Sequence, residues 1–211
     1  MAQYLVVHPD NPPLRLIRLA VEVVRSGGII AYPTDSSYAL GCAVTNKEGT
    51  ERIRRLRGLA VDHFLTLVCR DLREIATYAR VDNSVFRLLK AHTPGPYTFI
   101  LPATREVPRR LQDPKRRTIG LRVPDNRVTQ ALLDALQAPL MSCTLILPGD
   151  SMPLGDPEEI RDRLAHQVDL VLNGGICGLE PTTVVEWDGE IFHVRRKGSG
   201  DSSLFAPVSG G

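Results

Sequence analysis

The sequence predicts a mixed α/β protein that folds as a single domain. Short apolar runs of strand type alternate along the chain with segments whose apolar residues recur at helical spacing. An Asp-Gly turn at 188–190 lies between two strand candidates and predicts a hairpin near the end of the chain. The 211 residues contain neither internal repeats nor low-complexity linkers. We therefore expect one domain over residues 1–200 and a flexible tail over 201–211.

The first half of the chain reads as short strands joined by amphipathic helices. Between Pro13 and Gly27 the apolar residues Ile17, Val21 and Val24 recur on one face, which predicts a helix over 14–25. A strand over 29–32 follows, and the next residue, a proline, closes it because proline has no amide proton to donate. The other elements expected here are a strand over 4–7, a helix over 46–59, a strand over 64–69 and helices over 71–78 and 82–91.

Turn signals divide the second half in the same way. Thr93-Pro94-Gly95-Pro96 predicts a turn before a strand over 97–101, and Pro124 closes a strand over 118–123. Asp125 is the expected N-cap of a helix that runs to 136, and Asp156 is the expected cap of another. The segment 105–117 is basic and irregular. The remaining expected strands cover 139–147, 168–172, 182–187 and 191–195.

Composition excludes several classes of protein. Hydrophobic residues make up 43% and charged residues 24% of the chain, and the formal net charge is +2, as in ordinary soluble domains. The four cysteines, at 42, 69, 143 and 177, form no C-x-x-C pair and have no histidine at zinc-ligand spacing. We therefore expect no disulfide framework and no metal ligands. No signal peptide or membrane-length apolar run is present, so we expect a cytoplasmic protein without a membrane partner.

A polar loop follows the strand at 29–32. Thr34, Asp35, Ser36 and Ser37 leave the strand together, before Ala39-Leu40-Gly41 returns to apolar residues. Loops held by a buried strand often carry binding groups. An ordinary turn rich in Ser, Thr and Asp is the alternative interpretation.

Cations lie at the ends of several predicted elements. Arg57 ends a basic helix, Arg122 lies inside a predicted strand, and 195–197 is Arg-Arg-Lys. From Arg105 through Arg122 there are seven Lys or Arg residues against two acids. Arg122 should either pair with an internal carboxylate or face a ligand, because an unpaired buried charge is costly. Arginine with nearby hydroxyls suits carboxylate or phosphate recognition, whereas a solvated basic surface is the alternative.

Common catalytic motifs are absent. The chain has no G-x-x-x-x-G-K-[ST], G-x-G-x-x-G, H-E-x-x-H or G-x-S-x-G sequence. Among the five scattered histidines, only His63, beside Asp62, is a candidate site residue.

Five short motifs resemble, in order, those of a known family. They are Y-P-T-D-S at 32–36, T-P-G-P-Y-T-F at 93–99, I-G-L-R-V-P at 119–124, P-L-M-S-C-T at 139–144 and P-T-T-V-V-E at 181–186. They resemble motifs of the YrdC-like proteins, the L-threonylcarbamoyladenylate synthases that start threonylcarbamoyl modification of tRNA. The similarity runs from about residue 10 to 200 and is greatest to the YciO branch.

The resemblance implies a fold and a chemistry. The implied fold is a YrdC-like twisted open mixed sheet with helices on one side and a concave basic face. The implied reaction joins L-threonine, bicarbonate and ATP and releases pyrophosphate, with Mg²⁺ and cations neutralising the phosphates. Family members are also associated with tRNA and double-stranded RNA.

The sequence departs from the family at its phosphate-binding tetrad, K-x-R…S-x-N. Arg57 replaces the lysine, Leu59 replaces the arginine, and Thr144 replaces the asparagine, whereas Ser142 is kept. Each lost charge-assisted contact costs about 1.5–3 kcal/mol. We therefore expect weak synthase activity or none, unless Arg54 or Arg55 substitutes.

The resemblance also implies roles for individual residues. The catalytic candidates are Arg57, Ser142 and Thr144. The threonine-side candidates are Thr34, Thr66, Arg122 and Thr182. The nucleotide-side candidates are Arg57, Thr118, Ser142, Thr144 and Arg196. The RNA-binding candidates are Arg109, Arg110, Lys115, Arg116 and Arg117.

Three functions remain open at this point. The first is a threonylcarbamoyl-AMP synthase, the second is a non-catalytic protein that binds double-stranded RNA or tRNA, and the third is a related ligase for another small carboxylate. The basic segment 105–117 contains no aromatic residue for base stacking, so RNA recognition would depend on shape and phosphates.

Overall fold

A computed structural model describes residues 1–60, 63 and 65–205, and they form one mixed ten-stranded sheet with helices. The strand order is β1-β8-β2-β3-β7-β4-β6-β5-β9-β10. The strands are β1 Gln3–Val6, β2 Ile30–Tyr32, β3 Ala39–Ala43, β4 Thr66–Val68, β5 Tyr97–Pro102, β6 Thr118–Arg122, β7 Leu140–Thr144, β8 Leu170–Asn173, β9 Thr183–Trp187 and β10 Phe192–Arg196. The α-helices are α1 Leu14–Arg25, α2 Lys47–Arg57, α3 Leu72–Tyr78, α4 Asn83–His92, α5 Arg127–Leu136 and α6 Pro157–Leu164, and 3₁₀ turns cover Arg109–Leu111 and Ser202–Phe205.

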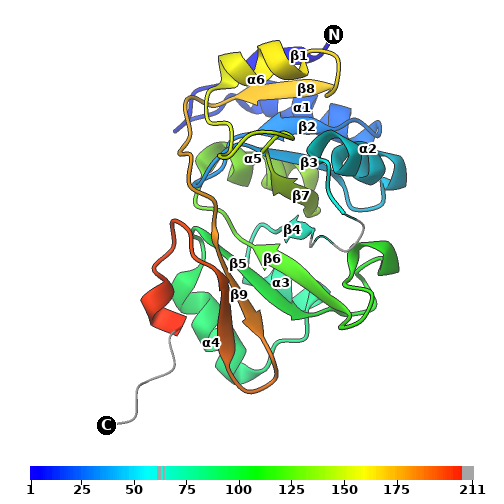
Figure 1. Ribbon diagram of the computed structural model, residues 1–211. Helices are drawn as coiled ribbons and strands as arrows, with labels where there is room; N and C mark the ends of the chain where they lie inside the picture. Colours follow the sequence, from blue (N-terminus) through cyan, green and yellow to red (C-terminus); the bar gives the residue numbers. More distant parts are fainter. Residues whose placement is uncertain (61–62, 64, 206–211) are drawn as a thin grey trace.

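The sheet is assembled in two parts of unequal helix content. β1, β8, β2, β3 and β7 lie together with α1, α2, α5 and α6, whereas β4, β6, β5 and β9 lie with α3 and α4 (Figure 1). The β4–β7 pairing, antiparallel with Thr66 opposite Ser142, joins the two parts. The sheet is therefore continuous, but its two ends have different surroundings.

Helices cover both faces of the sheet, so the expectation of helices on one side was wrong. Alternate residues of a strand point to opposite faces, and in β2 Ala31 belongs to one apolar cluster and Ile30 to the other. The cluster that contains Ala31 includes α2, α3, α4 and α6, and the cluster that contains Ile30 includes α1 and α5. The helices α1 and α5 cover only part of the sheet face on which Ile30 lies. Among the described residues, no helix covers the rest of that face.

Most expected elements are confirmed within one to three residues, and the helix Leu14–Arg25 has the expected bounds. The cap of α5 was predicted wrongly, because Asn126 accepts the amide proton of Thr129, whereas the amide of Asp125 donates to Asp35. The strand at Ala39–Ala43 was missed, since Gly41 interrupts a short apolar run.

The last residues were expected to be flexible. Ser202–Phe205 forms a 3₁₀ turn, and Phe205 is buried against Phe99 and Phe192. Residues 206–211 lie outside the described part of the chain, as do Val61, Asp62 and Phe64, on which parts of the predicted strand and loop fall.

Candidate functional site

A cavity of about 610 Å³ opens on the part of the sheet face that α1 and α5 leave uncovered. In β6 the side chains of Ile119 and Leu121 point into the core, whereas Gly120 and Arg122 line the cavity. The same alternation in β5 puts Thr98 and Ile100 toward the cavity. The period of two along each strand therefore determines which residues form the floor.

One row of paired residues crosses this floor from strand to strand. Ser142, Thr66, Gly120, Ile100 and Glu186 are successive partners across β7, β4, β6, β5 and β9, and all line the cavity. Four strand spacings separate the first from the last, about 19 Å along the sheet. A Cβ on Gly120 would lie 2.9 Å from the Thr66 hydroxyl, which is too close. Because glycine has no side chain, none fills the cavity at the middle of the floor.

Arg122 is held by the polar loop. Its guanidinium pairs with Asp35, and both side chains are buried, with exposures of 8% and 10%. It also donates to the hydroxyl of Ser36 at 3.3 Å, while the other carboxylate oxygen of Asp35 accepts the amide of Asp125 at 2.9 Å. The Nε of Arg122 is buried and has no partner among the described residues. Arg122 therefore pairs with an internal carboxylate, the first of the two alternatives, and it also lines the cavity.

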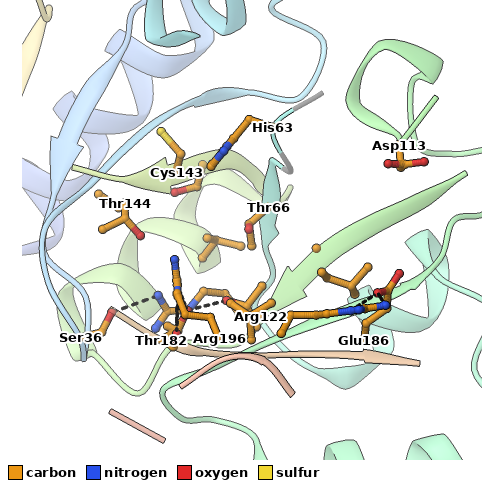
Figure 2. Close-up of a pocket in the computed structure, with 18 of the residues that line it drawn as sticks. Ser36, His63, Thr66, Asp113, Arg122, Cys143, Thr144, Thr182, Glu186 and Arg196 are labelled. Carbon is orange, nitrogen blue, oxygen red and sulfur yellow. Dashed lines mark hydrogen bonds and ion pairs between the residues drawn. The ribbon is translucent and has the colours of Figure 1, made fainter. Parts of the chain in front are cut away.

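A second guanidinium, that of Arg196, lies beside this pair. Burial lowers the pKa of Arg196, and the positive charge of Arg122 lowers it further. Arg196 donates to the carbonyl of Thr182 at 3.0 and 3.2 Å, and the Thr182 hydroxyl bonds to that of Thr98 at 2.9 Å. Figure 2 shows Arg122, Thr182 and Arg196 together near Ser36. Two cations with one carboxylate favour an anion at this point.

Two of the predicted hydroxyls already have partners within the fold. Thr34 accepts the amides of Ser36 and Ser37 at 3.2 Å each and donates to the Ser37 carbonyl at 2.6 Å. Ser142 bonds to the hydroxyl of Tyr32 at 2.6 Å and donates to the carbonyl of Leu40 at 3.0 Å. Both residues shape the wall of the cavity, and their remaining capacity to bind a ligand is small.

The C-terminal end of α2 supplies Arg57. The Nε of Arg57 is buried without a hydrogen-bond partner in the described residues. Arg57 lines the cavity beside Cys143, whose pKa burial raises to about 11 although the Arg57 charge opposes that shift. Figure 2 places His63, Cys143 and Thr144 at this side of the cavity. Leu59 packs against the apolar core, so it does not replace the missing arginine contact.

The opposite end of the row has a different chemistry. Glu186 is buried and pairs with Arg116 at 2.7 Å and with Arg195 on β10. Asp113 and Lys115, in the turn before β6, also line the cavity at this end. Figure 2 shows Asp113 and Glu186 on the far side of the cavity from Ser36 and Thr144. The cavity therefore has two cationic ends.

A match to a protein family covers most of the chain. Residues 22–198 match the Sua5_yciO_yrdC family, which is described as telomere recombination. The chain belongs to this family. The uncharacterized protein YciO of Escherichia coli K12 is 55% identical over 205 residues, which are 97% of this chain and 100% of that protein. A threonylcarbamoyl-AMP synthase of Halorhodospira halophila is 32% identical over 178 residues, 84% of this chain and 92% of that protein.

Solved structures of family members share the fold. The crystal structure of E. coli YciO gives a TM-score of 0.95 at 55% identity and covers 98% of this chain and 100% of that chain. P. abyssi Sua5 complexed with L-threonine gives a TM-score of 0.85 at 21% identity and covers 92% of this chain and 57% of that chain. The YrdC-like mixed sheet that the sequence predicts is therefore confirmed.

The cavity brings together most of the residues that the family resemblance selects. It is lined by Thr34, Arg57, Thr66, Arg122, Ser142, Thr144, Thr182 and Arg196. Thr118 is not in the lining, although its hydroxyl is buried without a partner in the described residues. The predicted RNA-binding residues fall into two groups. Lys115 and Arg116 line the cavity, whereas Arg109, Arg110 and Arg117 do not. Arg110 donates to the carbonyl of Val44.

Sequence reasoning missed the acidic members of the site. Asp35 was recognised only as part of a polar loop, and Glu186 only as the end of a motif. An acid at the end of a predicted buried strand, like the arginine in a strand, was the available signal for Glu186. Among the described residues there is no group of three potential metal ligands and no helix long and apolar enough to span a membrane.

Proposed function

We propose that the cavity binds a nucleotide together with a small carboxylate such as L-threonine, and that the chain is a slow threonylcarbamoyl-AMP synthase. The observation that carries this proposal is the charge of the cavity. Its lining contains six cations, Arg57, Lys115, Arg116, Arg122, Arg195 and Arg196, and two acids, Asp113 and Glu186. In the described part of the chain Arg57, Lys115 and Arg196 have no carboxylate partner. Such a surplus suits a ligand with several negative charges.

The two substrates would meet above the sheet floor. Arg122 and Arg196 are the donors for the threonine carboxylate, because their guanidinium groups lie beside each other and, in the described part of the chain, only Arg122 has a carboxylate partner. The threonine nitrogen carries the carboxyl group from bicarbonate. A carbamate oxygen attacks the α-phosphorus of ATP, the bond from that phosphorus to the bridging oxygen breaks, and pyrophosphate leaves with the electron pair. Arg57 and Thr144, which line the cavity, are the proposed donors to phosphate oxygens.

The described residues offer no clear site for Mg²⁺. Asp35 and Glu186 are both engaged by arginine, and the carboxylate of Asp113, which lines the cavity, accepts two backbone amides. The described residues contain no cluster of three metal-ligating side chains. Mg²⁺ in this reaction would therefore be coordinated mainly by the nucleotide phosphates and water, as is common for this ion.

The test is threonine-dependent release of pyrophosphate from ATP in the presence of bicarbonate and Mg²⁺. We expect slow release by the natural chain, none by Arg122→Ala, and about a tenfold faster rate in Thr144→Asn, which restores one neutral donor. Thr144 lines the cavity, so this change is better isolated than Leu59→Arg, which would put a charge against the core. Release equal to that of Arg122→Ala in both the natural chain and Thr144→Asn would contradict the synthase proposal.

Binding of double-stranded RNA or tRNA is the second candidate function. Six cations between residues 105 and 117 are exposed, Arg105, Arg109, Arg110, Lys115, Arg116 and Arg117. If this surface binds RNA, affinity should fall steeply as salt rises, because each neutralised phosphate releases a counterion. No binding of a duplex at low salt would remove this candidate.

A further inference from the structure

We infer that the Glu186 end of the cavity is a separate phosphate subsite formed by Lys115, Arg116 and Arg195, and that it takes phosphate groups of a nucleotide. This inference rests on the nucleotide-binding part of the proposed function. It assigns to Lys115 and Arg116 a role in the cavity that differs from the RNA surface predicted from the sequence. The ligand would then carry negative groups at both ends of the floor.

The first support is the arrangement of charges at this end. The buried carboxylate of Glu186 accepts from Arg116 and from Arg195, whose side chains remain 57% and 48% exposed. One acid thus brings two guanidinium groups together and leaves other N–H donors of each available to a ligand. Lys115 adds a third cation that has no carboxylate partner among the described residues. Cationic donors grouped in this way suit a phosphate.

The second support is the turn that presents Lys115 and Arg116. The carboxylate of Asp113 accepts the amides of both residues, at 2.9 and 2.5 Å. The negative charge of Asp113 is therefore directed at backbone amides of its own turn. The lysine side chain lines the cavity along with Asp113, and the segment returns into β6 directly afterwards.

The third support is the separation from the other cationic end. Glu186 and Ser142 are the two ends of the same row, four strand spacings or about 19 Å apart. One small group such as a carboxylate cannot contact both ends, whereas an extended nucleotide with its phosphates can approach that span. The cavity volume of about 610 Å³ is in the range of small-molecule sites.

The end of the cavity near Ser142 offers few donors for phosphate groups, so a second phosphate subsite would help to bind a polyphosphate. There Leu59 packs against the core, and the hydroxyl of Ser142 is hydrogen-bonded to the hydroxyl of Tyr32 and the carbonyl of Leu40. Arg57 and Thr144 line the cavity at that end, and Arg122 and Arg196 there are the proposed donors to the threonine carboxylate. The cations that would offset the charge of a polyphosphate therefore lie mainly on the turn 113–117 and on β10.

The experiment compares two double variants with the same change in formal charge. Lys115→Gln/Arg116→Gln removes two cavity cations, and Arg105→Gln/Arg109→Gln removes two exposed cations of the same segment that do not line the cavity. Calorimetric titration with inorganic tripolyphosphate and with ATP measures affinity without threonine or turnover. We expect the cavity variant to bind both probes at least about tenfold more weakly, and the control variant to stay within about twofold.

Three outcomes would overturn the inference. Equal losses of affinity in the two variants would mean that the probes respond to the overall positive charge of the segment and not to a defined subsite. No binding of either probe by the natural chain would mean that no phosphate subsite exists. A cavity variant that loses affinity for an RNA duplex but not for tripolyphosphate or ATP would place these cations on an RNA surface. Discrimination between the variants, without threonine-dependent pyrophosphate release, would support the subsite while contradicting the synthase. Urea unfolding midpoints check that both variants are folded.

Discussion

Both ends of the cavity pair arginine with a carboxylate, but the two ends differ in how far the arginines are buried. At one end Asp35 and Arg122 are both buried, and the pair is surrounded by the loop that follows β2. At the other end the buried acid Glu186 faces two half-exposed arginines, Arg116 and Arg195. Burial of both partners makes an ion pair a structural requirement, whereas exposed arginines can leave their acid and remain solvated. The first end should be rigid and the second adaptable.

The largest expected effect comes from breaking the rigid end. Asp35→Ala leaves the Arg122 charge buried without its acid and removes the acceptor of the Asp125 amide. We expect the free energy of unfolding to fall by about 3 kcal/mol, the low end for a broken buried pair, because the cavity admits water to Arg122. Urea unfolding measures this loss. Asp35→Asn, which keeps an acceptor, should lose less, and equal stability of Asp35→Ala and the natural chain would contradict the comparison.

A much smaller effect is expected at the adaptable end. Glu186→Gln releases Arg116 and Arg195, which are 57% and 48% exposed and can be hydrated in place. We expect the free energy of unfolding to change by about 1 kcal/mol or less in the same urea assay. A loss as large as that of Asp35→Ala would show that this end is also a structural ion pair. Arg195→Gln, which leaves Glu186 paired with Arg116, serves as the matched control.

The parts of this molecule that could be predicted from sequence are those with local causes. Pro13 and Gly27 with a regular apolar face determine α1, and the Asp-Gly turn determines the β9–β10 hairpin. The cap of α5 could not be predicted in this way, because Asp125 and Asn126 are both good caps. Asp35, 90 residues earlier in the sequence, binds the amide of Asp125 and leaves the capping role to Asn126.

The site shows the same division. Arg122 could be selected because an arginine inside a predicted strand demands a partner or a ligand. Arg116 was assigned to an RNA surface because its neighbours in sequence are basic, yet it pairs with Glu186, 70 residues away. The register that makes Glu186 an end of the cavity floor depends on β5 pairing with both β6 and β9. Sequence patterns select residue types, whereas these pairings decide which of them meet.

The smallest expected effect is a pH dependence of stability that arises at the hairpin of the adaptable end. Asp188, in the turn of the hairpin that carries Glu186 and Arg195, has a pKa well below 3.8 because the amides of Ile191 and Glu190, and then His193, bond to its carboxylate. A lowered pKa in the folded state stabilises the protein above pH 3.8, and this contribution is lost as the pH falls below that value. Asp188→Asn keeps an acceptor for the turn but removes the titration. We therefore expect the natural chain to lose slightly more stability than Asp188→Asn between about pH 5 and about pH 3, measured as the shift in urea midpoint. Identical pH profiles of the two proteins would show that this turn does not contribute.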